Sequence, residues 1–514
     1  MTGRLWQWML AYLVLLAAAS AWFADTAWKS VTGYQSPYAL DRQFGAGPAL
    51  VERAVLVVLD GLRADRVSEL PSFGRLAARG ASGVMRTTEP SLSYPARAAL
   101  VSGAWPEVSG VTTNAASGPV PVQSLLGLGA DLGMRVAVFG SGFWPRAFGP
   151  GMDHRRFGGR LPEFTPIALA RWQDESCDRA VDHLRSADAQ LHIIDVMAGD
   201  EAGHEFGGAS DAYINVIAAV DQCLGRIVDA AGPDTVVLGV SDHGHIDRWG
   251  KGGHGGLEPE VMAAPFAMAG PRVAVTGPLD AEIVDIAPTL SMLLGLPIPA
   301  NSQGRVIWEA LEVQGEQRSR LEALERTQRT ALAAHLPDRD AALAANRSRR
   351  LPWAILAVLW FVSVAALAAR RQDLAGLAIA VAVFAAAYAA LFFVFQLGTS
   401  ISASVRQEYL NGFLARNIAA TGLAFVAAAL FLVSRVGRNR EVAVRLAAIL
   451  TSVFGLAVAA VHGFHGLRME GFMLELGPGF KAYLNLFAIV GLALGAVGVS
   501  LAMPRLPRFG RGRS

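Results

Sequence analysis

The stretch TVVLGVSDHGHIDRWGKGGHGG, residues 235–256, joins a short apolar run to a glycine-rich loop that holds three histidines. The run is β-branched and apolar, which is typical of a strand buried on both faces. The loop places Asp242, His243 and His254 among glycines, which allow the chain to bend sharply. The pattern therefore predicts a buried strand whose carboxyl end leads into a cluster of possible metal ligands.

Similar apolar runs precede this stretch. They are AVLVVLD (54–60), RVAVFG (135–140) and LHIIDVM (191–197). Segments with helical apolar periodicity lie between the runs, at 71–79, 175–186 and 211–231. This alternation predicts one α/β domain over residues 50–311, with a mainly parallel sheet covered by helices on both faces.

The rest of the chain is too apolar for a wholly soluble protein, since the 514 residues are 53% hydrophobic with a mean hydropathy of +0.36. Residues 5–24 predict an N-terminal transmembrane anchor or a signal peptide with a cleavage site at Ala-Ser-Ala, 19–21. The length of the run favours the anchor. The charged, helix-prone residues 312–350 are expected to form a connector at the membrane surface.

Five further apolar runs, each close to the length of a membrane span, predict an α-helical transmembrane domain over residues 351–503. They lie at about 352–369, 374–397, 415–434, 444–462 and 482–503. Arginines between alternate runs, and in the basic tail 504–514, fit a cytoplasmic N-terminus and tail. Arg347, Arg349 and Arg350 disagree, because they would lie on the outer side.

These segments predict a multi-pass membrane protein with the α/β domain outside the cytoplasm. Lysine occurs only at positions 29, 251 and 481 while arginine and alanine are abundant, which suggests a GC-rich bacterial genome. We therefore expect a bacterial inner-membrane protein with a periplasmic α/β domain. A net charge of +2 gives no global basic field that would indicate a nucleic-acid partner.

The two cysteines, Cys177 and Cys223, form no CxxC motif, which excludes a cysteine zinc knuckle or a redox motif of that kind. Both fall in helix-like segments of the α/β domain. They could pair in an oxidising compartment, but their spacing does not establish the geometry.

Acidic and imidazole side chains follow the predicted strands in three places. Asp60 ends the first run, Asp200 and His204 follow the third, and the opening stretch supplies the rest. Three aspartates and three histidines suit Zn²⁺, or Mn²⁺, better than Ca²⁺. Six ligands divide into two sites of three, and two cations about 4 Å apart form a clamp for phosphoryl displacement.

A nucleophile is expected in TTEPSLSYPARAALVSG, residues 87–103. Ser93 precedes a helix-like run, and an alcohol at a helix N-terminus beside a divalent cation can act as a nucleophile. Ser91 is a rival on spacing alone. Arg97 either steers a phosphate or is a solvated helix residue. His245 is expected to be a loop residue or a partner of a ligand.

In this order, the motifs "DG", "PSLSYP", "GDxxGH", "SDHG" and "GGHGG" resemble the alkaline phosphatase superfamily, and in particular its type I phosphodiesterase/nucleotide pyrophosphatase branch. The resemblance covers about residues 53–308 and implies an alkaline-phosphatase-like sandwich. It assigns one metal to Asp60, Asp242 and His243 together with the nucleophile Ser93. It assigns the other metal to Asp200, His204 and His254.

The same resemblance matches Asn114 to an asparagine that contacts a phosphate oxygen, although a turn residue is the alternative. The segments SDHGHIDRWGKGGHGG and LGLPIPANSQG, and the order of the domains, are similar to glycosylphosphatidylinositol (GPI) ethanolamine-phosphate transferases. The chain departs from that pattern at Pro95-Ala96-Arg97, where a histidine usually stands two residues after the proline. This difference leaves the headgroup and the acceptor open.

The expected function is a membrane-bound, two-metal phosphotransferase. It would move a phosphoethanolamine-type group from a phospholipid donor to a lipid-linked glycan or another envelope acceptor through a serine-linked intermediate. A phosphodiesterase or nucleotide pyrophosphatase that uses water as the acceptor is the alternative. A non-catalytic envelope scaffold with a structural metal site is a third, less favoured interpretation.

Overall fold

The computed structural model describes residues 5–116, 118–156, 163–247, 251–369, 374–391, 419–428, 440–465 and a few isolated positions beyond. The strands are β1 (Arg53–Leu59), β2 (Ala81–Arg86), β3 (Val136–Gly140), β4 (Asp153–Arg156), β5 (Leu191–Val196), β6 (Thr235–Val240), β7 (Ala263–Ala269) and β8 (Thr276–Glu282). They form one sheet in the order β4-β3-β5-β1-β6-β7-β2-β8.

The sheet is mixed. β7 runs antiparallel to both of its neighbours, β6 and β2, and the other pairings among the described strands are parallel. The mainly parallel sheet predicted from the alternation is therefore present, and each of the four predicted runs forms one of its strands. The antiparallel strand was not predicted, because AAPFAMA has neither β-branched residues nor a polar–apolar alternation.

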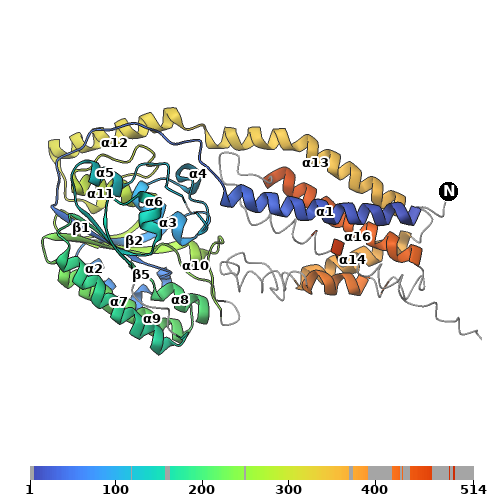
Figure 1. Ribbon diagram of the computed structural model, residues 1–514, viewed down its shortest axis with the longest axis horizontal. Coiled ribbons are helices and arrows are strands. Elements are labelled where there is room, and N and C mark those ends of the chain that lie inside the picture. The colour runs from blue at the N-terminus through green and yellow to red at the C-terminus, as the bar shows by residue number, and fades with distance from the viewer. Residues whose placement is uncertain are drawn as a thin grey trace, which may run out of the picture.

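Helices cover both faces of the sheet (Figure 1). One face packs against α2 (Pro71–Ala78), α7 (Pro166–Ser186), α8 (Ala198–Phe206) and α9 (Asp211–Ala231). The other packs against α3 (Ser93–Ser102), α5 (Leu125–Asp131), α6 (Phe143–Phe148) and α11 (Ile286–Leu294). Two short helices, α4 (Pro106–Ser109) and α10 (Pro259–Met262), complete the domain.

The central strand β1 shows why this domain needs two helical layers. Val55 and Val57 belong to the core beneath α9, while Leu56 and Val58 belong to the core beneath α3. Successive side chains on a strand point to opposite faces, so an uninterrupted apolar run requires cover on both sides.

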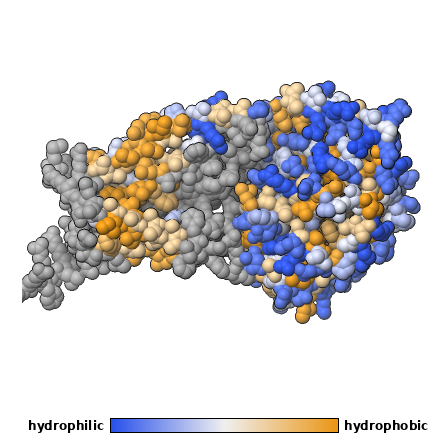
Figure 2. Space-filling view, turned by 180° about the vertical axis from the view of Figure 1, so that it is seen from behind, coloured by the Kyte–Doolittle hydropathy of each residue, from blue (hydrophilic) through white to orange (hydrophobic). Residues whose placement is uncertain are grey.

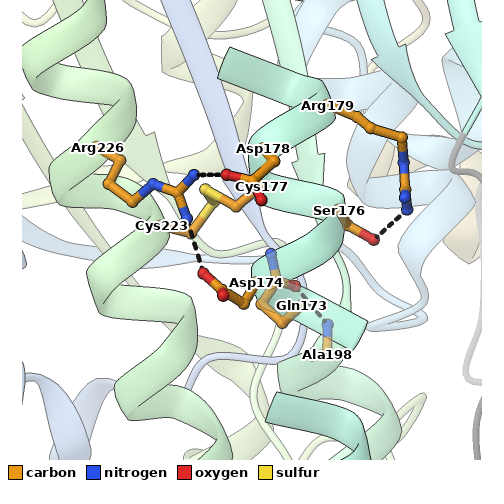
Figure 3. The surroundings of a disulfide bond; sticks show 9 residues. All are labelled: Gln173, Asp174, Ser176, Cys177, Asp178, Arg179, Ala198, Cys223 and Arg226. Atoms are coloured by element: carbon orange, nitrogen blue, oxygen red, sulfur yellow. Dashed lines mark hydrogen bonds and ion pairs between the residues drawn. A yellow bond between two sulfur atoms is a disulfide. The ribbon is translucent and has the colours of Figure 1, made fainter. Parts of the chain in front are cut away.

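Cys177 on α7 and Cys223 on α9 form a disulfide, which settles the pairing that their spacing left open. Figure 3 shows the bridge beside Arg226, which pairs with Asp174 at 2.7 Å and also with Asp178. Because these charges are partly exposed, they add little stability, and the disulfide is the stronger connection between the two helices.

We expect the double variant Cys177→Ala/Cys223→Ala to lose about 2–4 kcal/mol of unfolding free energy, because the unfolded chain gains conformational freedom. Thermal unfolding of the purified protein, followed by circular dichroism, measures the loss. Wild-type protein treated with a reductant is the matched control and should be destabilised equally. Unchanged unfolding of both samples would contradict this role.

The segment predicted as a connector consists of two helices with different surroundings. α12 (Gly315–His335) packs on the α/β domain, where Gln328 donates to the carbonyl oxygens of Ala300 and Ser302 at 3.0 and 2.9 Å. Glu325 accepts from the indole of Trp308 at 2.6 Å. The next helix, α13 (Arg339–Ala369), continues without a break into the first apolar run after the domain (Figure 1).

Two described helical segments are long and apolar enough to cross a membrane, namely Gln7–Thr26 within α1 (Leu5–Thr32) and Arg347–Ala368 within α13. Shorter apolar segments lie in α14 (Leu374–Ala389), at Ala419–Ala428, and in α16 (Arg440–His465). The predicted run 482–503 falls almost wholly outside the described residues. The prediction of six spans therefore remains a prediction.

These helices pack together through apolar contacts, and the hydroxyls of Tyr12 on α1 and Ser452 on α16 lie 3.2 Å apart. Large side chains such as Trp8, Trp353 and Trp360 point outward and are exposed. In Figure 2 hydrophobic residues cover the described surface of this part, whereas the α/β domain is largely hydrophilic. This distribution is the one expected when the helices face lipid and the domain faces water.

Candidate metal and nucleophile site

The predicted ligands lie at one edge of the sheet, where neighbouring strands end. Asp60 directly follows β1, Asp242 and His243 follow β6, and Asp200 lies on α8 just after β5. Because β5, β1 and β6 are adjacent and parallel, their carboxyl ends meet at the same edge. Ser93 reaches this edge as the first residue of α3.

Asp60, Asp242 and His243 form one cluster, called here the Asp60 group, whose possible ligand atoms all lie within 4.8 Å of one another. His243 Nε2 lies 3.5 Å from Asp60 Oδ1 and 3.7 Å from Asp242 Oδ2. Ser93 Oγ lies 3.2 Å from the same nitrogen. The group and the hydroxyl are buried, so they are held away from bulk water.

Each carboxylate of the Asp60 group has one oxygen bound by the protein and one left over. Asp242 Oδ1 accepts from the amides of Gly61 and His243 at 3.1 and 3.0 Å, and Asp60 Oδ2 accepts from Arg97 at 2.5 Å. Asp60 Oδ1 and Asp242 Oδ2 are buried without a hydrogen-bond partner. Orphaned buried oxygens converging beside an imidazole nitrogen fit a divalent cation.

The raised pKa values of the Asp60 and Asp242 carboxyls also favour a bound cation. Burial is the main cause that raises the pKa of Asp60 well above its usual range, and the nearby Asp242 raises it further. Burial also raises the pKa of Asp242, although Arg97 opposes this. Two crowded, desolvated carboxylates are costly as anions, and a bound cation would remove that cost.

Asp200, His204, His245 and His254 form a second cluster, called here the Asp200 group. Asp200 Oδ1 lies 3.3 Å from both His204 Nε2 and His254 Nε2, and these two nitrogens are 3.2 Å apart. Burial opposes ionisation of Asp200, but the neighbouring imidazoles outweigh it and hold its pKa well below its usual range. One carboxylate oxygen and two imidazole nitrogens at this separation match a three-ligand cation site.

The two groups adjoin each other, because the imidazole rings of His243 and His254 stack with their centroids 3.6 Å apart. All six residues expected as ligands from the sequence thus come together in two neighbouring sets of three.

His245 contacts a predicted ligand, which is one of the two roles expected from the sequence. It is fully buried, and its Nε2 lies 3.0 Å from Asp200 Oδ1. An added Cβ at Gly203 would lie 2.4 Å from the His245 ring, so this glycine makes room for it. Its position among the six glycines of the loop was the available signal, but spacing alone did not distinguish it from a loop residue.

The two candidate nucleophiles have different surroundings. Ser91 Oγ donates to Gly256 O at 2.8 Å and accepts from Gly255 N at 2.9 Å, and the Ser91 carbonyl contacts His254 Nδ1 at 2.9 Å. Ser91 therefore binds the glycine-rich loop that carries His254, whereas the Ser93 hydroxyl faces the Asp60 group. Asn114 lies beside Ser93, since its Oδ1 accepts from the amide of Tyr94 at 2.9 Å.

Arg97 corrects both interpretations drawn from the sequence, because it is neither solvated nor exposed to a substrate phosphate. Its side chain is 2% exposed, with Nη2 on Asp60 and Nε 3.4 Å from Asp195 Oδ1. Burial lowers the pKa of Arg97, but the two carboxylates more than offset this and raise it above its ordinary value. Sequence reasoning missed Asp195 as its partner because this aspartate stands inside an apolar strand.

Two family models match the α/β domain. Residues 54–120 match type I phosphodiesterase/nucleotide pyrophosphatase, and residues 168–298 match the metalloenzyme superfamily. These matches confirm the predicted resemblance and support a metal-dependent phosphoryl-transfer enzyme.

Curated relatives include GPI ethanolamine phosphate transferase 3, catalytic subunit, from Homo sapiens. It is 28% identical over 293 residues, which is 50% of this chain and 26% of the relative. GPI ethanolamine phosphate transferase 1 from Aspergillus fumigatus is 27% identical over 368 residues, which is 58% of this chain and 34% of the relative. The alignments therefore span only about a quarter to a third of these relatives.

Among solved structures, a 2-O GAG sulfatase is similar with a TM-score of 0.44 and 18% identity, covering 52% of this chain and 75% of that chain.

Proposed function

We propose that this protein is a membrane-bound, two-metal phosphotransferase that moves a phosphoethanolamine-type group from a phospholipid to a lipid-linked glycan or another envelope acceptor. The single observation that carries the proposal is the convergence of the Asp60 and Asp200 groups beside the Ser93 hydroxyl. The similarity to GPI ethanolamine phosphate transferases supports the choice of transferred group.

We assign one cation to Asp60, Asp242 and His243 together with Ser93, and the other to Asp200, His204 and His254. Zn²⁺ suits this set of carboxylates and imidazoles best, with Mn²⁺ as the alternative. When bound, the two cations would supply the Lewis-acid charge that favours the serine alkoxide and offsets charge on the phosphoryl oxygens.

The proposed reaction consists of two successive displacements at the phosphorus atom, and Ser93 is the nucleophile of the first. Ser93 Oγ attacks the phosphorus of the donor diester in line, a bond from Oγ to phosphorus forms, and the bond from phosphorus to the lipid alcohol breaks. The departing alcohol takes up a proton. In the second half the acceptor hydroxyl attacks the same phosphorus, loses its proton, and returns Ser93 as a free hydroxyl. Asn114 is expected to donate to a phosphoryl oxygen.

The location of the site suits a lipid substrate. Figure 1 shows α3, α8 and α10 on the side of the α/β domain that faces the apolar helices. The disulfide favours an oxidising compartment, consistent with a periplasmic domain on a bacterial inner membrane. Confinement to a membrane would restrict the search for a lipid donor and a lipid-linked acceptor to two dimensions.

Purified full-length protein in vesicles that contain phosphatidylethanolamine labelled in its headgroup tests the first half of the reaction. We expect quenched protein to carry the label on the Ser93 peptide, detected by mass spectrometry. Comparison of lipids and glycans from a deletion strain and the wild type would then identify the acceptor as the species that loses the group. Absence of the label from Ser93, with no acceptor changed in the deletion strain, would refute the proposal.

The alternative is a phosphodiesterase that uses water as the acceptor, and the match to type I phosphodiesterase/nucleotide pyrophosphatase favours it. The same vesicles separate the two reactions. Steady release of free phosphoethanolamine without an added acceptor would indicate hydrolysis, whereas a single turnover that stops at labelled protein would indicate transfer.

Removal of the metal should abolish either reaction. Dialysis against a strong chelator is expected to lower the rate by at least about 100-fold, because charge stabilisation is the main part of phosphoryl-transfer catalysis. Zn²⁺ or Mn²⁺ should restore the rate, with two ions per chain by elemental analysis, and Ca²⁺ should not. Full activity in metal-free protein whose circular dichroism is unchanged would contradict the assignment.

A further inference from the structure

Two arginines on the sheet face that α3 covers have no role in the proposed chemistry. Arg146 lies on α6 and Arg156 is the last residue of β4, and both are exposed. Within the described residues neither forms an ion pair. Unpaired guanidinium groups beside a phosphoryl-transfer site call for an explanation, because they attract anions.

The backbone brings the two arginines together at Gly142. Arg146 Nε donates to Gly142 O at 3.1 Å. Arg156 approaches the same residue, since a Cβ built on Gly142 would be 3.4 Å from Arg156 Nη2. Two guanidinium groups thus lie beside one residue that has no side chain.

Arg146 contacts Tyr94, the residue that follows the nucleophile. Arg146 Nη2 donates to the hydroxyl of Tyr94 at 3.2 Å, and Tyr94 is the neighbour of Ser93. The Tyr94 ring stacks on Phe143 with centroids 4.4 Å apart, which holds the phenol in place. Arg146 is therefore linked through the Tyr94 side chain to the residue that follows the reacting serine.

The sheet register places Arg156 at the edge of the sheet where the predicted metal ligands lie, and on the face that α3 covers. It pairs with Gly140 at the carboxyl end of β3, next to β5, so it lies at the edge where the metal ligands emerge. Val138, two residues before Gly140, faces the core beneath α3, and alternation puts Arg156 on this face too. Arg155 pairs with Phe139, which faces the opposite core.

We propose that Arg146 and Arg156 form a subsite for a second anionic group of the substrate, a phosphate carried by the alcohol that leaves or joins the reacting phosphorus. This inference rests on the proposed function, because the anion that binds the two arginines is part of the substrate of that reaction. It narrows the substrate class to diesters in which one alcohol carries its own phosphate, as a phosphorylated lipid-linked glycan does.

A matched pair of substrates tests the subsite. One is the phosphodiester of ethanolamine and glycerol, and the other is the same diester with a phosphate on the terminal glycerol hydroxyl, so that the phosphorylated alcohol is the leaving group of the proposed reaction. We expect the Arg146→Ala/Arg156→Ala variant to raise KM for the phosphorylated diester about tenfold and to leave its kcat unchanged, as loss of hydrogen bonds to a charged group implies. KM for the plain diester should not change.

Arg155→Ala is the control, because it removes a neighbouring charge from the opposite face of the same strand. Equal effects on both substrates, or the same effect in Arg155→Ala, would overturn the subsite.

If wild-type protein hydrolyses neither diester, the proposed function is in question but the subsite can still be tested. Calorimetry then measures the affinity of Ser93→Ala protein, with and without the two arginines, for each diester. Tighter binding of the phosphorylated diester that is lost in the double variant supports the subsite, and equal binding of the two diesters refutes it.

Discussion

Ser93→Ala is expected to lower the rate of headgroup transfer or diester cleavage at least about 1,000-fold and to abolish labelling of the protein, because Ser93 supplies the hydroxyl that lies against His243 Nε2. The aspartate and histidine ligands assigned to both cations remain in place in this variant. Metal content and thermal unfolding should therefore match the wild type, and only single-turnover kinetics and mass spectrometry of quenched protein should reveal the change.

Ser91→Ala is the matched control, since it removes a hydroxyl two residues away that binds only the loop backbone. We expect a loss of about 1–3 kcal/mol of stability, because Gly255 N and Gly256 O lose a buried partner. Labelling of Ser93 should persist. A Ser91→Ala protein that is unlabelled while Ser93→Ala is labelled would reverse the assignment of the nucleophile.

Arg97→Met is expected to lower the unfolding free energy by about 3–5 kcal/mol. The substitution leaves Asp60 and Asp195 buried without their counter-charge, and a buried charge without a partner is costly. Thermal unfolding measures the loss. The variant should also bind metal more weakly, since Arg97 fixes Asp60 Oδ2 and so aims Oδ1 at His243.

The double variant Arg97→Met/Asp195→Asn separates these two effects. In the wild type, Trp144 Nε1 and Ser141 N donate to Asp195 Oδ2. The amide oxygen of asparagine can still accept both of these hydrogen bonds. We expect much of the stability to return while metal retention against a weak chelator stays low. Recovery of both properties would show that Arg97 only neutralises charge, and an unchanged stability in Arg97→Met would contradict the buried ion pair.

Much of the fold was predictable because the relevant signals are local. The helix predicted at 211–231 coincides with α9, which begins after a Ser210 cap and ends at Gly232 with a positive φ. The helix predicted at 175–186 begins earlier, at Pro166, because Thr165 caps it and Pro166 occupies its first turn. β2, β4 and β8 lack a continuous apolar run, and β7 lacks β-branched residues, so these strands depend on pairing with their neighbours.

The sequence by itself determined the types of ligand, their order along the chain and their positions after strands, since each follows from a short motif. Only the tertiary structure decided which atoms meet. Arg97 and Asp195 are far apart in the chain and look ordinary in their own segments, and they pair because Asp195 faces the side of the sheet that α3 covers. His245 meets Asp200, and Arg146 and Arg156 meet at Gly142, for the same reason, because a parallel sheet gathers distant loops at one edge and no local pattern encodes their separation.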